Sequence, residues 1–251
     1  MNQPALTLEQ LRETIEQRVL YRDGMMLVLN KPPGVPVHRG PAAAGQRNAP
    51  DLESAFDALR FGLPRVPSLA HRLDRDTSGC LVLGRHRKAL EKLGRMFRDG
   101  AIDKTYLAVV RGRPPAGRGE ISLPLARRDP ARGWWMKVDP DGLPSVTLWR
   151  ALGEAGSEDG GPLTLMELTP VTGRTHQLRV HCAAMGWPIV GDAIYGDAPR
   201  FGGPGLHLHA RSVTIPLYPA KPAVHVVAPP PPHMATLLAR CGFAQAPGDA
   251  T

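Results

Sequence analysis

Apolar residues recur at helical spacing in several parts of the chain. Helices are expected over residues 8–19, 52–60, 86–98, 176–185 and 234–241. Thr7 and Gln10 form the capping-box pattern that begins the first of these helices. Asp51 can cap the second helix and Thr175 the fourth, while Gly100 stands where a left-handed residue would end the third.

Short apolar runs between turn-forming residues predict strands. They are expected over residues 25–30, 80–85, 104–112, 120–125, 145–152, 163–170 and 206–216. The acidic, glycine-rich loop "GEAGSEDGG" separates the strands at 145–152 and 163–170, so these two should pair as a hairpin. Strands joined in this way, with helices interleaved elsewhere, predict an α+β fold with a mixed, largely antiparallel central sheet and flanking helices.

The composition is that of a globular protein, with 42% hydrophobic residues in a chain of 251. We find no internal repeat and no linker, so we expect a single domain over residues 1–251. The 31 basic residues exceed the 23 acidic ones, and this net charge of +8 favours an anionic partner such as nucleic acid. A GC-rich coding sequence would produce the same excess of arginine, so the charge alone leaves the partner open.

The cysteines and the N-terminal sequence bear on the cellular compartment. Cys80, Cys182 and Cys241 are far apart and odd in number, which fits core residues in a reducing compartment better than a disulfide framework or a paired-cysteine metal site. The first ten residues lack the pattern of a secretory signal, and no apolar run has the length of a membrane helix. We therefore expect a cytoplasmic protein with no membrane partner.

Several well-known site motifs do not occur in the sequence. There is no GxxxxGK phosphate loop, no GxGxxG turn, no GxSxG elbow and no HxE of a zinc deaminase. These absences disfavour nucleotide-driven, NAD-linked and zinc-hydrolytic chemistry. A carboxylate reaction without a cofactor, or no reaction at all, remains.

The stretch "HRLDRDTSG", residues 71–79, places Asp74 and Asp76 among Arg72 and Arg75. A carboxylate held ionised by a neighbouring guanidinium and removed from water can serve as a nucleophile or a base. A surface cluster of salt bridges would have the same residues and little energetic weight. This stretch alone leaves both interpretations open.

The stretch "GRTHQLRVH", residues 173–181, falls on the predicted helix 176–185. At helical spacing His176 and Arg179 share one face, and Gln177 and His181 share another. A helix with so many polar residues in its first turns fits either a solvated amphipathic helix or one side of a functional site.

Taken together, these stretches resemble the ordered motifs of the RluA-type RNA pseudouridine synthases. "LVLNKPPGVPVH" precedes them, "KTYLAVVRG" lies between them and "GDAIYG" follows, and the resemblance extends from about residue 21 to about residue 227. The resemblance implies the pseudouridine synthase fold. It also implies the isomerisation of uridine to pseudouridine in RNA, without a cofactor or a metal.

The resemblance also assigns roles to individual residues. Asp74 would be the catalytic aspartate that helps to break the glycosidic bond, and Asp76 is its competitor for this role. Tyr106 would lie against the target uracil, and Arg179 would pair with Asp74 and keep that carboxylate ionised. Arg72 would enter the space that the flipped nucleotide leaves.

Further residues are expected to bind or position the RNA. Those at or near the motifs are Lys31, His71, Arg174, His176 and Gln177, and those assigned to phosphate contact in the middle of the chain are Arg111, Arg113, Arg127 and Arg128. His176 and His181 can alternatively order their helix. The segment 111–132, with six arginines against two acidic residues, is the candidate for target recognition.

The expected substrate is a transfer RNA or ribosomal RNA with an exposed loop uridine, because flipping a nucleotide costs less in a loop than in a duplex. Only about twenty residues precede the first strand. That is too few for the S4-type domain that many relatives carry, so we expect the catalytic domain alone, as a monomer. Two alternatives remain: a non-catalytic RNA-binding or RNA-chaperone protein of the same fold and, with less support, a glycoside hydrolase that uses Asp74 and Asp76.

Overall fold

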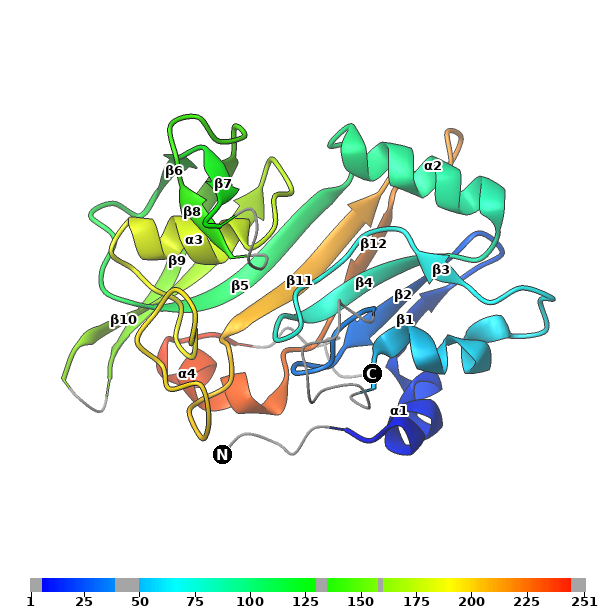
Figure 1. The fold of residues 1–251 in the computed structure, drawn as a ribbon, viewed down its shortest axis with the longest axis horizontal. Helices are drawn as coiled ribbons and strands as arrows, with labels where there is room; N and C mark the ends of the chain where they lie inside the picture. The colour runs from blue at the N-terminus through cyan, green and yellow to red at the C-terminus, as the bar shows by residue number, and fades with distance from the viewer. Residues whose placement is uncertain (1–5, 39–49, 130–134, 158–159, 245–251) are drawn as a thin grey trace. The chain divides into compact units, whose positions relative to one another are not determined.

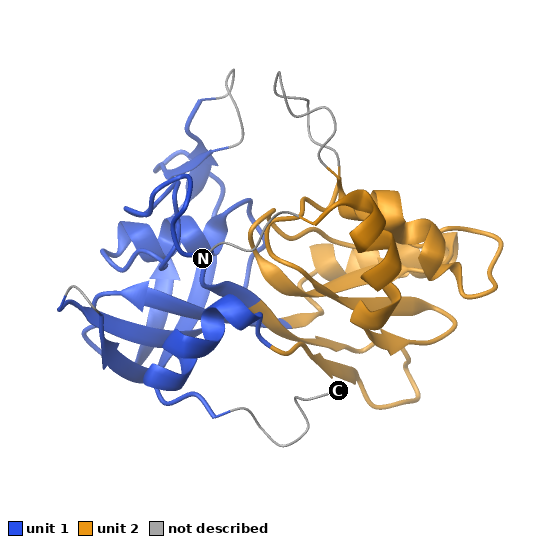
Figure 2. Ribbon diagram, turned by 90° about the horizontal axis from the view of Figure 1, so that it is seen from below, with its two compact units in different colours: residues 1–2, 104–209, 230–251 blue, residues 3–103, 210–229 orange. Residues whose placement is uncertain are grey.

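The computed structural model describes residues 6–38, 50–129, 135–157 and 160–244 (Figure 1). The chain forms two compact units (Figure 2). Unit 1 consists of residues 1–2, 104–209 and 230–251, and unit 2 consists of residues 3–103 and 210–229. Because each unit is assembled from segments that are far apart in the sequence, no linker marks the division. The expectation of one domain over the whole chain stays a prediction.

Unit 2 contains the N-terminal strands and the strand that follows the first polar motif, "HRLDRDTSG" at residues 71–79. Its helices are α1 (Leu8–Thr14), α2 (Arg87–Arg98) and the 3-10 segments η1 (Glu16–Arg18) and η2 (Leu52–Arg60). Its strands are β1 (Val19–Arg22), β2 (Met26–Lys31), β3 (Ser68–Leu69), β4 (Ser78–Gly84), most of β11 (Leu208–Ile215) and β12 (Val224–Val227). The strand order is β1-β2-β4-β11, and β1 with β2, β2 with β4, β3 with β4 and β11 with β12 pair antiparallel.

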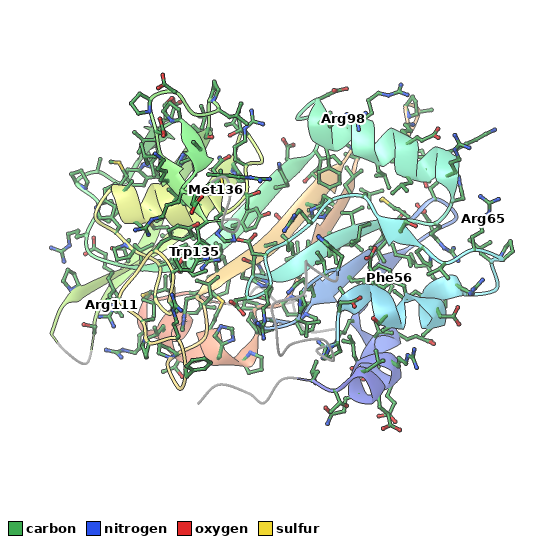
Figure 3. All side chains as sticks on the ribbon, in the orientation of Figure 1. Phe56, Arg65, Arg98, Arg111, Trp135 and Met136 are labelled. Atoms are coloured by element: carbon green, nitrogen blue, oxygen red, sulfur yellow. The ribbon has the colours of Figure 1, made fainter. Side chains whose placement is uncertain are left out.

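Both faces of β2 and β4 are buried. Val28 and Val82 pack with Leu93 of α2 in one core cluster. The alternate residues Leu27 and Leu83 are fully buried as well. Phe56 of η2, labelled in Figure 3, is 1% exposed. Burial on both sides explains why these strands read as continuous apolar runs rather than as alternating ones.

Unit 1 contains a second set of antiparallel strands. They are β5 (Asp103–Arg111), β6 (Arg118–Ser122), β7 (Leu125–Arg127), β8 (Met136–Val138), β9 (Val146–Gly156) and β10 (Pro162–Pro170). Its helices are α3 (Gln177–Ala184), α4 (Ala235–Arg240) and the 3-10 turn η3 (Pro232–Met234). The order β5-β10-β9-β6 is antiparallel throughout, and β7 pairs antiparallel with β8 as a separate ribbon.

Strand β5 separates two core clusters of unit 1. Ala108 and Val110 belong to the cluster of α3, whereas Leu107 and Val109 belong to the cluster that includes Leu238 of α4. The strand is therefore covered by helices on both faces.

The predicted α+β class with a largely antiparallel sheet is confirmed, and so is the hairpin of β9 and β10. The capping box is also present, since Gln10 N donates to Thr7 Oγ1 at 3.2 Å and Thr7 N donates to Gln10 Oε1 at 3.0 Å. Asp51 accepts from Ser54 N at 3.0 Å and caps η2. Gly100 has a left-handed backbone with φ of 69° at the end of α2.

Other boundaries differ from the predicted ones. The helix expected over 8–19 ends at Thr14; the 3-10 turn η1 follows it, and Val19 pairs with Leu29 of β2. The strand expected over 120–125 is interrupted at Pro124, which has no N–H to donate to a neighbouring strand. Strand β9 continues to Gly156, through residues that were expected to form a loop.

Thr175 does not cap α3. The residue before the helix is His176, with a left-handed φ of 54° and no capping side chain. None of the helices in the described part of the chain has the length and apolar character needed to cross a bilayer.

Candidate active site

The first polar motif forms the loop that leads into β4. Every residue of β4 is buried, as are Leu73 and Thr77 of the loop, whereas Arg72 is exposed and Asp74 is half-buried. Thr77 N donates to Asp74 O at 3.2 Å and closes a tight turn. The loop is therefore anchored by its apolar and hydroxyl residues and carries its charged residues toward its accessible side.

Lys31 is buried beneath this loop and ties it to the turn that follows β2. Its side chain is fully buried, and its Nζ donates to Pro32 O at 2.7 Å, Arg75 O at 2.8 Å and Thr77 O at 2.9 Å. Burial lowers the pKa of Lys31 to about 7, against the opposing effect of the negative charges of Asp76 and Asp74. The phosphate contact expected of Lys31 is therefore wrong, because its ammonium group lies inside the protein and all three of its protons have acceptors.

Three further contacts fix the loop. Arg75 Nε donates to Gly34 O at 3.0 Å. His71 Nε2 accepts from Val82 N at 2.9 Å, and its ring stacks on Phe97 with centroids 4.3 Å apart. These contacts make His71 an anchor between the loop and β4, and the RNA contact expected of it stays a prediction.

Gly79 fixes the point where the loop becomes strand. It has φ of 106°, and a Cβ added there would lie 2.2 Å from the carbonyl oxygen of Ala210 in β11. Only glycine fits this position. The loop therefore enters the strand in direct contact with a neighbouring backbone.

Arg72 is exposed and makes no hydrogen bond or ion pair with another residue that the structure describes. Its guanidinium is therefore accessible to a ligand, which suits the role expected of it.

The second polar motif is "GRTHQLRVH", residues 173–181, and its part on α3, residues 177–181, is buried and not solvated. Gln177 is 3% exposed, and its amide contacts are Val146 O at 2.9 Å, Thr147 Oγ1 at 3.0 Å, Thr172 Oγ1 at 2.7 Å and Arg174 N at 3.1 Å. The RNA contact expected of Gln177 is wrong for that reason, since its amide joins the start of α3 to β9.

His181 lies on the same face of α3 as Gln177, as the spacing predicted. Its Nδ1 is 2.9 Å from Thr147 Oγ1, and its Nε2 is 3.0 Å from Leu123 O. Burial lowers the pKa of His181, which favours the neutral form of the ring. Of its two expected roles, ordering the helix is the one that these contacts support.

Arg179 and Asp192 form a buried, two-pronged ion pair. Arg179 Nε lies 2.7 Å from Asp192 Oδ2, and Arg179 Nη2 lies 2.8 Å from Asp192 Oδ1, with the side chains 4% and 1% exposed. Oδ1 also accepts from Ile194 N at 2.9 Å and from Tyr195 N at 3.0 Å. Although burial acts to raise it, the hydrogen bonds from Arg179 and the two backbone amides hold the pKa of Asp192 below its usual value.

Tyr195 connects this pair to the β7–β8 ribbon. The Arg179 guanidinium lies 5.3 Å from the centroid of the Tyr195 ring, His176 Nδ1 is 2.8 Å from the Tyr195 hydroxyl, and Met136 N donates to that hydroxyl at 2.9 Å. His176 is 7% exposed. These contacts favour a role in ordering the start of α3 over the RNA contact expected of His176.

Strand β8 lies against α3 (Figure 1), and Figure 3 labels Trp135 and Met136 at the start of this strand. Arg200 lies over the Trp135 ring, 5.5 Å from its centroid. Arg127 and Arg128 at the end of β7 are exposed. Exposed cations and an aromatic ring therefore gather along one ribbon of unit 1.

Comparison with known proteins identifies the family. A family model described as RNA pseudouridylate synthase matches residues 25–184. The chain belongs to this RNA pseudouridine synthase family.

Individual relatives agree with that assignment. An uncharacterised RNA pseudouridine synthase of Zymomonas mobilis is 39% identical over 210 residues, which are 83% of this chain and 91% of that protein. Ribosomal large subunit pseudouridine synthase C of Haemophilus ducreyi is 37% identical over 236 residues, 90% of this chain and 69% of that protein.

Solved structures support the pseudouridine synthase fold. Human RNA pseudouridylate synthase domain containing 4 superposes with a TM-score of 0.74 at 26% identity, over 95% of this chain and 98% of that chain. Human RNA pseudouridylate synthase domain containing 1 superposes with a TM-score of 0.68 at 32% identity, over 85% and 83% of the two chains.

The remaining expected site residues of this pseudouridine synthase are placed as follows. Tyr106 is half-buried on β5 opposite Leu168, and Arg174 is exposed. Arg113 pairs with Glu154 at 2.8 Å and Arg111 with Asp197 at 3.5 Å. The roles of Tyr106, Arg174 and these arginines stay predictions, as does the pairing of Arg179 in unit 1 with Asp74 in unit 2.

Sequence reasoning did not single out Asp192 and Tyr195 of this pseudouridine synthase. The signal is present in "GDAIYG": an aspartate that precedes a tight turn can accept from the amides two and three residues later. What the sequence does not show is that the other carboxylate oxygen meets Arg179.

Proposed function

We propose that this chain converts specific uridines in RNA to pseudouridine, with Asp74 as the group that starts the reaction. The Asp74 carboxylate promotes cleavage of the bond between the anomeric carbon of the ribose and N1 of uracil. The freed base turns, and its C5 forms the new bond to the same carbon. The proton of C5 is then lost, and N1 gains one, so that the product is an isomer of the substrate.

The observation that carries this proposal is the construction of the Asp74 loop. Lys31 holds the carbonyls of Arg75 and Thr77 from below, and Asp74 lies between its two exposed neighbours Arg72 and Arg75. A reacting group must be held in place by contacts that do not themselves take part in the chemistry. The contacts that Lys31 makes with this loop go to backbone carbonyls and do not involve the Asp74 carboxylate.

Arg179 is proposed to pair with the Asp74 carboxylate and to keep it ionised away from water. The guanidinium presents its N–H groups in a rigid fork. Asp192 engages Nε and Nη2 of this fork.

Tyr106 is proposed to lie against the uracil and to take part in removing the C5 proton, and Arg72 to fill the space of the flipped nucleotide. An arginine suits that space because its planar cation stacks on bases and contacts phosphates. Arg127, Arg128 and Arg174, all exposed, are proposed to contact phosphates.

The proposed substrate is a structured RNA with an exposed loop uridine. Large-subunit ribosomal RNA is the first candidate, because several relatives at about the same identity carry that substrate in their names, and transfer RNA is the second. We further propose that the enzyme acts as a cytoplasmic monomer without a metal or cofactor.

Pseudouridine mapping tests the activity. Total RNA from a strain that lacks this gene is incubated with the purified protein, in buffer and in buffer with EDTA, and pseudouridines are mapped. We expect new pseudouridines at one or a few loop positions under both conditions. An unchanged map, together with salt-sensitive RNA binding, would instead show a non-catalytic RNA-binding protein. Activity lost in EDTA and restored by a divalent metal would contradict the reaction without a metal.

A further inference from the structure

Arg179 has a rigid environment that the reaction itself does not require. The ion pair with Asp192 fixes Nε and Nη2 in one plane, and Asp192 is in turn fixed by the amides of Ile194 and Tyr195. The Tyr195 ring lies 5.3 Å from the guanidinium carbon. Asp192 and the Tyr195 ring thus fix the orientation of the Arg179 guanidinium.

Tyr195 also contacts the β7–β8 ribbon. The Tyr195 hydroxyl accepts from Met136 N at 2.9 Å, at the first residue of β8, and lies 2.8 Å from His176 Nδ1. Met136 is paired with Arg127 of β7, and Arg127 and Arg128 are exposed. The Tyr195 hydroxyl therefore links the β7–β8 ribbon, through Met136, to His176 at the start of α3, one turn before Arg179.

We propose that Asp192 is a positioning residue for Arg179, and that Tyr195 couples the β7–β8 ribbon to that arginine. This coupling keeps RNA that is bound by the β7–β8 ribbon at a fixed position relative to the Arg179 guanidinium, which is proposed to pair with Asp74. The proposal rests on the function proposed above for Arg179.

Stability alone does not account for this arrangement. Replacing a buried ion pair with apolar residues of similar volume is often neutral or stabilising, because both charges must be removed from water. A two-pronged pair, in contrast, restricts orientation in a way that packing of apolar side chains does not. The geometry points to orientation as the purpose of Asp192.

The test of Asp192 is Asp192→Asn. Asparagine keeps an oxygen for the amides of Ile194 and Tyr195 but loses the charge and one acceptor for Arg179. Activity is measured as tritium released from total RNA of the gene-deletion strain labelled with 5-tritiated uridine, over a range of RNA concentrations. We expect kcat to fall by about tenfold or more with KM unchanged, because Arg179 is then held less accurately for the reaction while the RNA contacts of the ribbon are retained.

The matched control is Asp57→Asn, which removes an exposed aspartate from Nε of Arg60, at 2.8 Å in unit 2. Its kcat and KM should equal those of the wild type. A smaller fall than about tenfold in a folded Asp192→Asn protein overturns the positioning role. Where Asp192→Asn melts below the assay temperature, Arg179→Lys decides the point: lysine keeps the charge but cannot form the two-pronged pair, so wild-type kcat in that variant also overturns it.

The test of the coupling is Tyr195→Phe, which removes only the hydroxyl. We expect KM for RNA to rise by about threefold or more while kcat is retained, because the ribbon loses its hydrogen bond to the helix. Tyr21→Phe in unit 2 removes one hydroxyl from Asp23, which keeps its second tyrosine partner Tyr218. This control should leave KM unchanged, and a wild-type KM in Tyr195→Phe overturns the coupling.

The tritium assay separates a failure of the proposed function from a failure of the roles proposed for Asp192 and Tyr195. If the wild-type protein releases no tritium, the proposed function fails. If the wild type is active and the Asp192 and Tyr195 variants match it, only the inference drawn here fails.

Discussion

The amine of Lys31 has no exposed surface and lies directly under the loop that carries Asp74. Its three bonds go to backbone carbonyls, from Pro32 on its own turn and from Arg75 and Thr77 on the loop. Hydrogen bonds to backbone carbonyl groups fix the backbone of the loop independently of its side chains. This makes Lys31 the residue on which the shape of the loop depends most.

Lys31→Met keeps the length and apolar volume of the stem and removes the amine. Three carbonyls then lose their donor, and leaving a buried polar group without a partner costs about 1–3 kcal/mol. We expect the free energy of unfolding at pH 7 to fall by about 2–4 kcal/mol, measured by urea denaturation, since water can reach part of the loop. An unchanged denaturation midpoint would show that these bonds do not stabilise the loop.

The amine also predicts a pH dependence of stability. Burial lowers the pKa of Lys31 in the folded protein to about 7, from 10.5 in the unfolded chain. Between these values the unfolded chain binds a proton that the folded protein does not, so the contribution of Lys31 to stability rises with pH and is lost as pH falls toward 7. The difference in unfolding free energy between wild type and Lys31→Met should increase by up to about 1.4 kcal/mol per pH unit from pH 7 to 10. A difference that stays flat or declines over this range would contradict the lowered pKa.

At the residue scale the sequence identified candidate positions better than it identified their roles. Lys31 and Gln177 were expected at the RNA surface, and both are buried with their polar atoms bonded to the protein. Residue type gives the chemistry of a side chain, but its partners come from segments far away in the sequence, such as Thr77 for Lys31 and Thr147 for Gln177.

At the scale of elements, the β7–β8 ribbon is the part of unit 1 with the clearest electrostatic character. Arg127 and Arg128 are exposed at its end, and Trp135 with Arg200 lies beside them. Each phosphate that such a ribbon neutralises releases counterions, which makes the binding constant depend on salt.

Arg127→Gln together with Arg128→Gln should weaken RNA binding and reduce its dependence on salt. We expect the slope of log binding constant against log salt concentration to become less negative by roughly 1–2, from two phosphate contacts. Filter binding at several salt concentrations gives the slope. Arg87→Gln with Lys88→Gln on α2 in unit 2 removes the same charge from an exposed site and should leave the slope unchanged; equal effects from the two pairs would show that only net charge matters.

The sequence predicted the type of most elements and was less accurate on their ends. Periodicity located α2, the β9–β10 hairpin and β4, because packing on one or both faces imposes those patterns. The first helix was expected to reach Val19, but that residue pairs with Leu29. A strand partner outside the local window decided this boundary, which no local spacing could show.

On the scale of the whole molecule, the residues of the proposed reaction are divided between the two units. Asp74 and Arg72 belong to unit 2, whereas Tyr106 and Arg179 belong to unit 1. Spacing along the chain could not reveal this division, because each unit is built from discontinuous segments. The order of motifs in the RNA pseudouridine synthase family supplied the connection among these residues, which composition and periodicity did not.

We propose that Asp74, and not its neighbour Asp76, starts the isomerisation. Both carboxylates lie half-buried on the same loop, so Asp74→Asn and Asp76→Asn make the same change of charge two residues apart. The direct measurement is tritium release from 5-tritiated uridine in total RNA of the gene-deletion strain, with thermal melting of each variant as a check on folding. We expect no detectable tritium release by folded Asp74→Asn and at least about a tenth of the wild-type rate by Asp76→Asn. Release by Asp74→Asn at the rate of Asp76→Asn would contradict this proposal.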